Sequence, residues 1–152
     1  MKIQQREREM EISHSEVKVK WVYPTSILMA GIDSRGASAV IGMLADEEPQ
    51  VTGLKASDLL LMSAASCSAY DVVMILKKRK EPLESLDVTC SGQMESEPVR
   101  RFTKLHLKYI VKGQVKPESV EKAIKLSEDK YCSVLNTLRG SVEISSEFEI
   151  ID

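Results

Sequence analysis

The chain has 152 residues, of which 43% are hydrophobic and 29% are charged, and its net charge at neutral pH is -2. These values are typical of a soluble globular protein that can bury a sizeable core. Lysine and arginine are scattered and mixed with glutamate. The charge pattern therefore excludes a strong electrostatic attraction to nucleic acid or to an anionic membrane.

The start of the chain and its cysteines bear on where the protein works. Residues 1–14 are charged and contain no apolar segment, which predicts a polar arm rather than a secretory signal, and residues 15–152 are expected to form one domain. The three cysteines, Cys67, Cys90 and Cys132, are a sparse and odd-numbered set that does not suit a structural disulfide framework. We therefore expect a cytoplasmic protein.

Three strands are predicted before the first helix. Residues 16–23 alternate between apolar and charged side chains, which is typical of a half-buried strand. Two further apolar runs, residues 26–32 and 37–44, flank the segment 33–36 (DSRG), whose composition predicts a tight turn between antiparallel strands. Residues 45–56 are expected to form a loop.

The longest predicted element is a helix over residues 59–76, with Ser57 as its N-cap and Asp58 in its first turn. Almost every residue of this helix is apolar or small, so we expect it to be buried on all sides, in a core or an interface. Its length also permits a membrane span, but Asp71 would then lie deep in the bilayer at a high energetic cost. We therefore expect no membrane association.

The remaining segments predict two strands, a helix and a last strand. Residues 86–94 and 102–112 alternate and form a hairpin, and residues 142–150 form the final strand. Because the helices are segregated rather than alternating with strands, the class is α+β with antiparallel sheets. Between the hairpin and the final strand, Pro117 begins a helix that Gly140 ends. Its inner stripe is predicted to comprise Val120, Ala123, Ile124, Ser127, Tyr131, Val134, Leu135 and Leu138.

Cys67 lies among small residues of the long helix. By its own neighbourhood it is a small buried hydrophobe, since nothing nearby in the sequence lowers the pKa of its thiol. Asp71 follows one turn later on the same face, and as a bare anion it would raise the pKa of that thiol, so a balancing cation is needed. Cys90 is on the apolar face of its strand and is expected in the core, whereas His106 is on the lysine-rich face of the next strand.

Cys132 has two interpretations. In a continuous helix it lies about 100° from the apolar stripe, at the edge of the core. Alternatively, residues 130–133 form a break and a new helical turn begins at Ser133, whose N-terminus would favour a thiolate. The two histidines, His14 and His106, are far from any cysteine in the sequence, so a zinc site would need scattered ligands and none is expected.

These segments together resemble the OsmC/Ohr family, most closely its YhfA-like branch. The residues that carry the resemblance are 59–61 (LLL), 66–73 (SCSAYDVV) and 75–78 (ILKK), which are similar to the cysteine helix of that family, and 130–134 (KYCSV), which is similar to its second cysteine site. The resemblance covers about residues 15–151.

The resemblance implies an OsmC-like fold and an intertwined homodimer with the two cysteine helices at its centre. It also implies a peroxidase that defends against oxidative stress. Cys67 would attack the peroxide and become a sulfenic acid, Cys132 would condense with it to a disulfide, and an external dithiol would restore the pair, without a metal or another cofactor. The apolar character of the helix favours organic hydroperoxides as substrates.

Hydroperoxide-reducing members of the family have a glutamate near the start of the cysteine helix and an arginine from the N-terminal sheet. The matching residues here are Asp58, which is shorter by one methylene, and Arg35 in the turn between strands. Asp58 and Cys67 are nine residues apart on one helix and face opposite ways, about 13.5 Å apart along the axis. Asp58 could therefore assist a Cys67 only from a second copy of the helix or across a bend.

Two other functions fit the same pattern. A non-catalytic dimeric module could bind a small apolar ligand between its helices, with the cysteines as passengers. A redox sensor or carrier could form the disulfide without turnover. Both redox functions require Cys67 and Cys132 within bonding reach, with Cα atoms less than about 7 Å apart after modest motion.

Overall fold

The structure of the protein is a computed structural model that describes residues 15–23, 28–42 and 53–151. The chain divides into two compact units, Met1–Ala56 and Ser57–Asp152. The predicted polar arm, residues 1–14, and most of the predicted loop, residues 45–56, lie outside the described residues. That residues 15–152 act as one domain stays a prediction.

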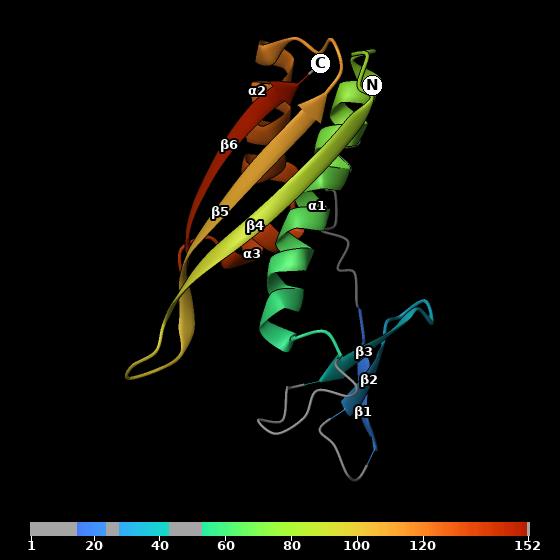
Figure 1. Cartoon of the computed structure of the whole chain (residues 1–152), viewed down its shortest axis with the longest axis vertical. Helices are drawn as coiled ribbons and strands as arrows, with labels where there is room; N and C mark the ends of the chain where they lie inside the picture. The colour runs from blue at the N-terminus through green and yellow to red at the C-terminus, as the bar shows by residue number, and fades with distance from the viewer. Residues whose placement is uncertain (1–14, 24–27, 43–52, 152) are drawn as a thin grey trace, which may run out of the picture. The chain divides into compact units, whose positions relative to one another are not determined.

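The first unit contains a three-stranded antiparallel sheet in the order β1-β2-β3 (Figure 1). The strands are β1 (Lys18–Tyr23), β2 (Leu28–Ile32) and β3 (Ser38–Gly42). All three were expected from the alternating and apolar runs. Asp33, in the predicted turn between β2 and β3, accepts hydrogen bonds on Oδ1 from the N–H groups of Arg35 and Ala37, each at 2.8 Å.

One prediction for this unit is wrong. The apolar residues of the first alternating segment are not half-buried: Val19 is 61% exposed and Trp21 is 57% exposed. The described part of this unit contains neither a helix nor a second sheet that could cover the face on which they lie. Alternation correctly indicated a strand, but burial of its apolar face needs a second layer.

The second unit consists of a sheet of three strands with helices on one of its faces (Figure 1). The helix α1 (Ala56–Lys78) comes first, followed by β4 (Ser85–Glu95) and β5 (Arg101–Lys112). The chain then forms α2 (Pro117–Leu126), a π-helical turn η1 (Ser127–Tyr131), α3 (Ser133–Leu138) and β6 (Glu143–Ile151). This order confirms the α+β class.

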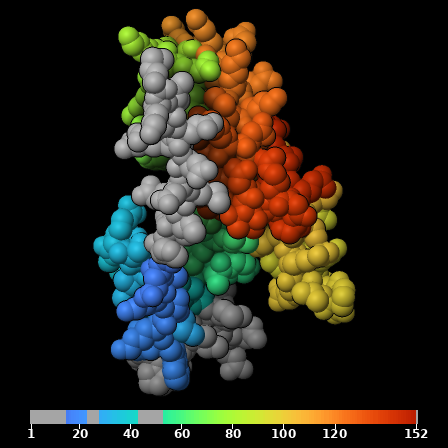
Figure 2. All heavy atoms as spheres, turned by 180° about the vertical axis from the view of Figure 1, so that it is seen from behind, coloured from blue at the N-terminus to red at the C-terminus, as the bar shows by residue number. Residues whose placement is uncertain are grey.

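The sheet departs from the antiparallel expectation at one pair. β4 and β5 pair antiparallel, but β5 and β6 pair parallel. The segment from α2 to α3 crosses the face of the sheet and returns the chain to the end at which β5 began, and a parallel pair requires such a crossover. The β4–β5 end of the sheet projects beyond the helices (yellow, Figure 2).

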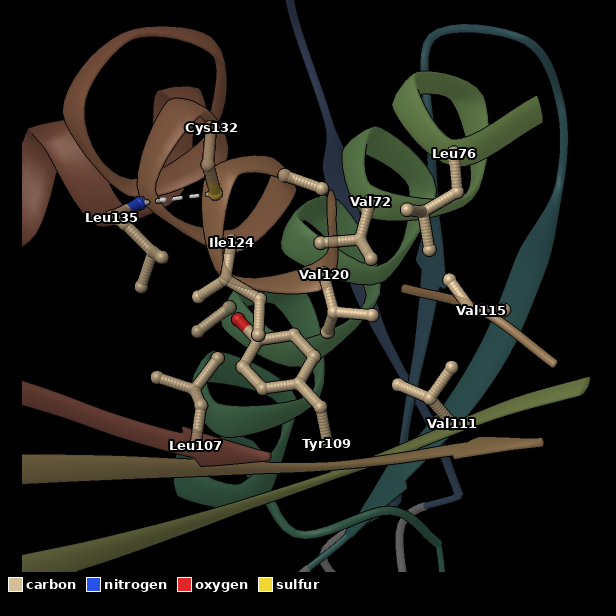
Figure 3. Packing of buried hydrophobic residues seen from close by; sticks show 12 residues of the cluster. Val72, Leu76, Leu107, Tyr109, Val111, Val115, Val120, Ile124, Cys132 and Leu135 are labelled. Carbon is tan, nitrogen blue, oxygen red and sulfur yellow. Dashed lines mark hydrogen bonds between the residues drawn. The ribbon is translucent and has the colours of Figure 1, made fainter. Parts of the chain in front are cut away.

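The core lies between this sheet and the helices (Figure 3). From residue 105 to residue 111, every second residue of β5 is fully or almost fully buried, as its alternation predicts. Cys90 is half-buried on β4 and packs against the same core, in line with its predicted place. The buried residues of β5 are Leu105, Leu107, Tyr109 and Val111.

Helix α1 begins one residue earlier than its predicted cap, and one of its faces is exposed in the single chain. It begins at Ala56, so Ser57 is not its N-cap but lies in its first turn, where its hydroxyl donates to the Asp58 carboxylate at 3.5 Å. Within one chain it is not buried on all sides, because Tyr70 is 67% exposed and Met74 is 50% exposed, and burial of this face in an interface stays a prediction. Only one stripe of α1 faces the core, and it consists of Ala64, Ser68, Val72 and Leu76.

The apolar character of α1 thus exceeds what its own chain buries. By length and by a mean hydropathy of 1.8, the helix could also span a membrane. However, its stripe at every fourth residue packs into the core of an α+β unit, as the core helix of a globular domain does.

Candidate functional site

Three side chains that the sequence singled out separately lie together in the second unit. The two sulfur atoms of Cys67 and Cys132 and a carboxylate oxygen of Asp71 are all within 4.8 Å of one another. Cys67 and Asp71 are one turn apart on α1, whereas Cys132 comes from the junction of η1 and α3. The fold therefore joins two thiols and a carboxylate, which we call the thiol cluster.

The π turn decides where Cys132 points. The N–H of Cys132 donates to the carbonyl of Ser127 at 2.8 Å, five residues back rather than four. One extra residue in the turn advances the helical phase by about 100°. Consequently Cys132 is fully buried and Tyr131 is 51% exposed, so the predicted edge position of Cys132 and the predicted inward position of Tyr131 are both wrong.

The break and the new helix of the alternative interpretation are confirmed, but the thiolate that it predicted at Cys132 is not, because burial raises the pKa of this thiol. Cys132 has an extended backbone, with φ -72° and ψ 102°, and a new helix begins at Ser133. The N–H of Leu135 donates to Cys132 Sγ at 3.4 Å (Figure 3). The thiol is thus the side-chain cap of α3 and its orientation is fixed by the backbone.

The two thiols have different environments. Burial raises the pKa of the Cys132 thiol to about 12; the neighbouring Cys67 acts in the same direction, and the Leu135 N–H opposes it. Cys132 therefore keeps its proton at neutral pH. Cys67 is only half-buried, and its Sγ lies 4.0 Å from the hydroxyl oxygen of Ser133.

Asp71 is held by a chain of buried hydroxyls. The Ser127 hydroxyl donates to Asp71 Oδ2 at 3.0 Å, Ser68 Oγ lies 2.9 Å from Ser127 Oγ, and the Tyr109 hydroxyl oxygen lies 2.7 Å from Ser68 Oγ. An ionised carboxylate only accepts, so the donation runs from Tyr109 through Ser68 and Ser127 to Asp71. Burial raises the pKa of Tyr109 to about 12, which keeps this hydroxyl a donor.

The sequence analysis did not assign Ser68, Ser127 and Tyr109 to the site. All three are fully buried. The signal in the sequence was a set of hydroxyl side chains at positions predicted to be buried. These were a serine in an apolar helix, a serine on the inner stripe of another helix, and a tyrosine at an inward position of a strand. Buried hydroxyls need partners, so these three residues could have been expected to bond one another.

A cavity of about 1010 Å³ opens beside Asp71. One part of its wall is apolar and another is the basic end of α1. Three basic residues line the same cavity as the Asp71 carboxylate, and the balancing of Asp71 by a cation stays a prediction. The lining residues are Asp71, Met74, Ile75, Lys77, Lys78, Arg79, Leu126 and Tyr131.

The other two supporting residues lie elsewhere on the chain. α1 is one continuous helix, so Asp58 is about 13.5 Å from Cys67 along its axis and is outside the thiol cluster of its own chain. Arg35 belongs to the first unit, where its side chain is 88% exposed and lies 3.6 Å from Asp33. The role of both residues in the site stays a prediction.

Comparison with known proteins identifies the class. The family model described as OsmC-like protein matches residues 46–147. Protein YhfA of Escherichia coli (strain K12) is 33% identical over 138 residues, which cover 90% of this chain and 98% of that protein. The chain belongs to the OsmC-like protein family, as its two cysteine segments indicated.

Solved structures agree with this assignment. A hypothetical protein from Aquifex aeolicus VF5 superposes with a TM-score of 0.77 at 28% identity, covering 93% of this chain and all (100%) of that one. A protein from Legionella pneumophila described as an organic hydroperoxide resistance protein OsmC and predicted redox protein superposes with a TM-score of 0.67. At 14% identity over 91% of this chain and 98% of that one, it shows the shared OsmC-like fold.

Proposed function

We propose that the protein is a thiol peroxidase that reduces organic hydroperoxides through Cys67 and Cys132. The observation that carries the proposal is the sulfur separation of at most 4.8 Å between two cysteines that are 65 residues apart in the sequence. A disulfide needs its sulfur atoms about 2.05 Å apart, so a local movement of less than about 3 Å would join them.

The reaction balances without a cofactor. The Cys67 thiolate attacks the terminal oxygen of the hydroperoxide, a sulfur–oxygen bond forms, the peroxide bond breaks, and the alcohol leaves after taking up a proton. The Cys132 sulfur then attacks the Cys67 sulfenic acid, a disulfide forms, and water leaves. An external dithiol reduces the disulfide by two thiol exchanges and restores both thiols.

The environments of the two thiols support this division of roles. The attacking thiol must meet the peroxide, and Cys67 is the half-buried one of the pair. The resolving thiol should stay protonated until the sulfenic acid exists, which agrees with the raised pKa of Cys132. Asp71 is close enough to both sulfurs to take the proton that Cys132 must release when it attacks.

The choice of organic hydroperoxides is supported by the surroundings of the site. The cavity beside Asp71 includes the apolar side chains of Met74, Ile75 and Leu126. The Legionella pneumophila protein with the same fold is described as an organic hydroperoxide resistance protein. A role in defence against oxidative stress follows.

We further propose that the protein acts as a homodimer in the cytoplasm. The outer face of α1 exposes large apolar side chains, including Met62 and Met74, which are 48% and 50% exposed in one chain. A second copy of the same helix would cover them. Such a dimer could also bring Asp58 or Arg35 of one chain to the Cys67 of the other, which is the supporting role that the family resemblance implies.

The test is the Cys67→Ser variant, assayed for consumption of cumene hydroperoxide with dithiothreitol as reductant. We expect loss of turnover, because serine cannot form a sulfenic acid. The Cys90→Ser variant is the matched control and should keep its activity. Full activity of Cys67→Ser would reject the mechanism.

A redox sensor or carrier is the second candidate, because two close sulfurs permit a disulfide without turnover. It predicts that cumene hydroperoxide oxidises the pair too slowly for turnover above the uncatalysed rate, although dithiothreitol still reduces the disulfide. Repeated turnover in the same assay would exclude it.

A further inference from the structure

We propose that Cys67, Asp71 and Cys132 form a binding site for a thiophilic divalent cation such as Zn²⁺. Their ligand atoms are already within 4.8 Å of one another. Tetrahedral zinc with Zn–S bonds of about 2.3 Å and a Zn–O bond of about 2.0 Å places its sulfurs about 3.8 Å apart and sulfur and oxygen about 3.5 Å apart. The two sulfurs therefore need to close by about 1.0 Å at most, and each sulfur and the oxygen by about 1.3 Å at most.

The ligand set has the composition that zinc selects. Two thiolates and a carboxylate supply three protein ligands, and a water in the fourth position would complete the tetrahedron. Cys67 and Asp71 are four residues apart on α1, so their side chains lie on one face of the helix, and Cys132 approaches from a different element. The scattered positions in the sequence thus become one coordination shell in the fold.

The residues behind two of the ligands fix their orientation. Asp71 Oδ2 accepts from Ser127, which is held in turn by Ser68 and Tyr109. Cys132 Sγ accepts from the Leu135 N–H. Hydrogen bonds of this kind to metal ligands hold them in place and tune their basicity.

An entry path also exists. Asp71 lines the cavity of about 1010 Å³, and both Asp71 and Cys67 are partly exposed. Two thiolates, one carboxylate and a divalent cation have a net charge of -1. The basic residues of the same cavity, Lys77, Lys78 and Arg79, lie where they would favour such a centre.

Binding of a cation and formation of the disulfide would exclude each other. The cation replaces the thiol protons and engages both sulfurs, whereas oxidation of the two thiolates to a disulfide withdraws two of the three ligands. Loading with zinc would therefore protect the pair from hydroperoxide, and oxidation would release the ion. This consequence rests on the proposed peroxidase function, but the cation site itself does not.

The site is tested by titrating the full-length, reduced protein with Co²⁺ alone under anaerobic conditions. We expect a near-ultraviolet thiolate-to-cobalt charge-transfer band, with the absorbance typical of two cobalt–sulfur bonds. One equivalent of Zn²⁺ should abolish this band. Cys67→Ser and Cys132→Ser should each halve the band, and Cys90→Ser should leave it unchanged. Tyr109→Phe, which removes one supporting hydroxyl, should weaken Co²⁺ binding by about 10-fold to 100-fold.

The proposal is overturned if the reduced parent protein, with all thiols titratable, gives no band, or if the band survives intact in Cys67→Ser. Circular dichroism identifies any variant that does not fold. A second measurement that needs no variant is alkylation of Cys67 by iodoacetamide, which Zn²⁺ should slow. Because neither measurement uses a peroxide, loss of the peroxidase hypothesis would leave this result standing, and the reverse also holds.

Discussion

The two cysteine segments use opposite means to present a thiol. Cys67 lies on a regular helix of 23 residues, half-buried among small neighbours. Cys132 lies where a π turn meets a short helix, is fully buried, and has its sulfur fixed by a backbone N–H. An accessible thiol and a restrained thiol are therefore brought together from two different kinds of local structure.

The difference suggests how one pair of identical groups can have two roles. A thiol that meets a substrate needs an accessible position on a rigid element. A thiol that keeps its proton needs a buried position. Asp71 lies near each sulfur and is held by a chain of buried hydroxyls. The difference between the two thiol environments is a property of the fold. Each of the following experiments changes one of these environments.

The largest effect is expected from Cys132→Ser, which removes the restrained thiol and leaves the accessible one. Without a dithiol, the variant should consume about one equivalent of cumene hydroperoxide and retain a sulfenic acid at Cys67, because no partner resolves it. Dimedone trapping followed by mass spectrometry measures this. The parent protein should close its disulfide and show little adduct. An adduct on Cys90 instead of Cys67 would reverse the assignment of the attacking thiol.

A smaller effect is expected from breaking the hydroxyl chain behind Asp71. Ser68→Ala leaves Tyr109 and Ser127 without their common partner in a fully buried place, which should lower the free energy of unfolding by about 1–3 kcal/mol. The matched control is Ser66→Ala, two residues earlier on an exposed position of the same helix, with an expected change near zero. Urea unfolding of both variants gives the comparison, and equal stabilities would show that the chain contributes nothing.

The smallest effect, measured per pH unit, concerns alkaline stability. The pKa of Cys132 is raised from 9.0 to about 12, and that of Tyr109 from 10.0 to about 12. Both groups hold their protons more tightly when folded, so their contribution is fully present below about pH 9 and is lost as the pH rises towards 12. Each group can contribute at most about 1.4 kcal/mol per pH unit.

The measurement is the free energy of unfolding under reducing conditions at several pH values above 8. Cys132→Ser should show a shallower decline than the parent protein, because serine does not titrate in this range. An identical decline in both proteins would show that the Cys132 thiol is not perturbed by its burial.

Much of the fold could be predicted because its signals are local. Alternation located β5 and its buried side chains Leu107 and Tyr109, and Pro117 marked the start of α2. The parallel pairing of β6 could not be predicted, because it depends on the path of the crossover rather than on any residue of the strand. Burial of β1 was predicted wrongly, because alternation does not say whether a second layer exists.

The sequence by itself determined the family, through its two cysteine segments, and it predicted that Cys67 and Cys132 would lie together. Only the tertiary structure decided that Cys132 points inward, because one extra residue in a π turn changes the helical phase without leaving a pattern in the sequence. It also decided that Asp71 meets both sulfurs and that three hydroxyls hold it. Such contacts join residues 40 to 60 positions apart, and periodicity reports only on neighbours along one element.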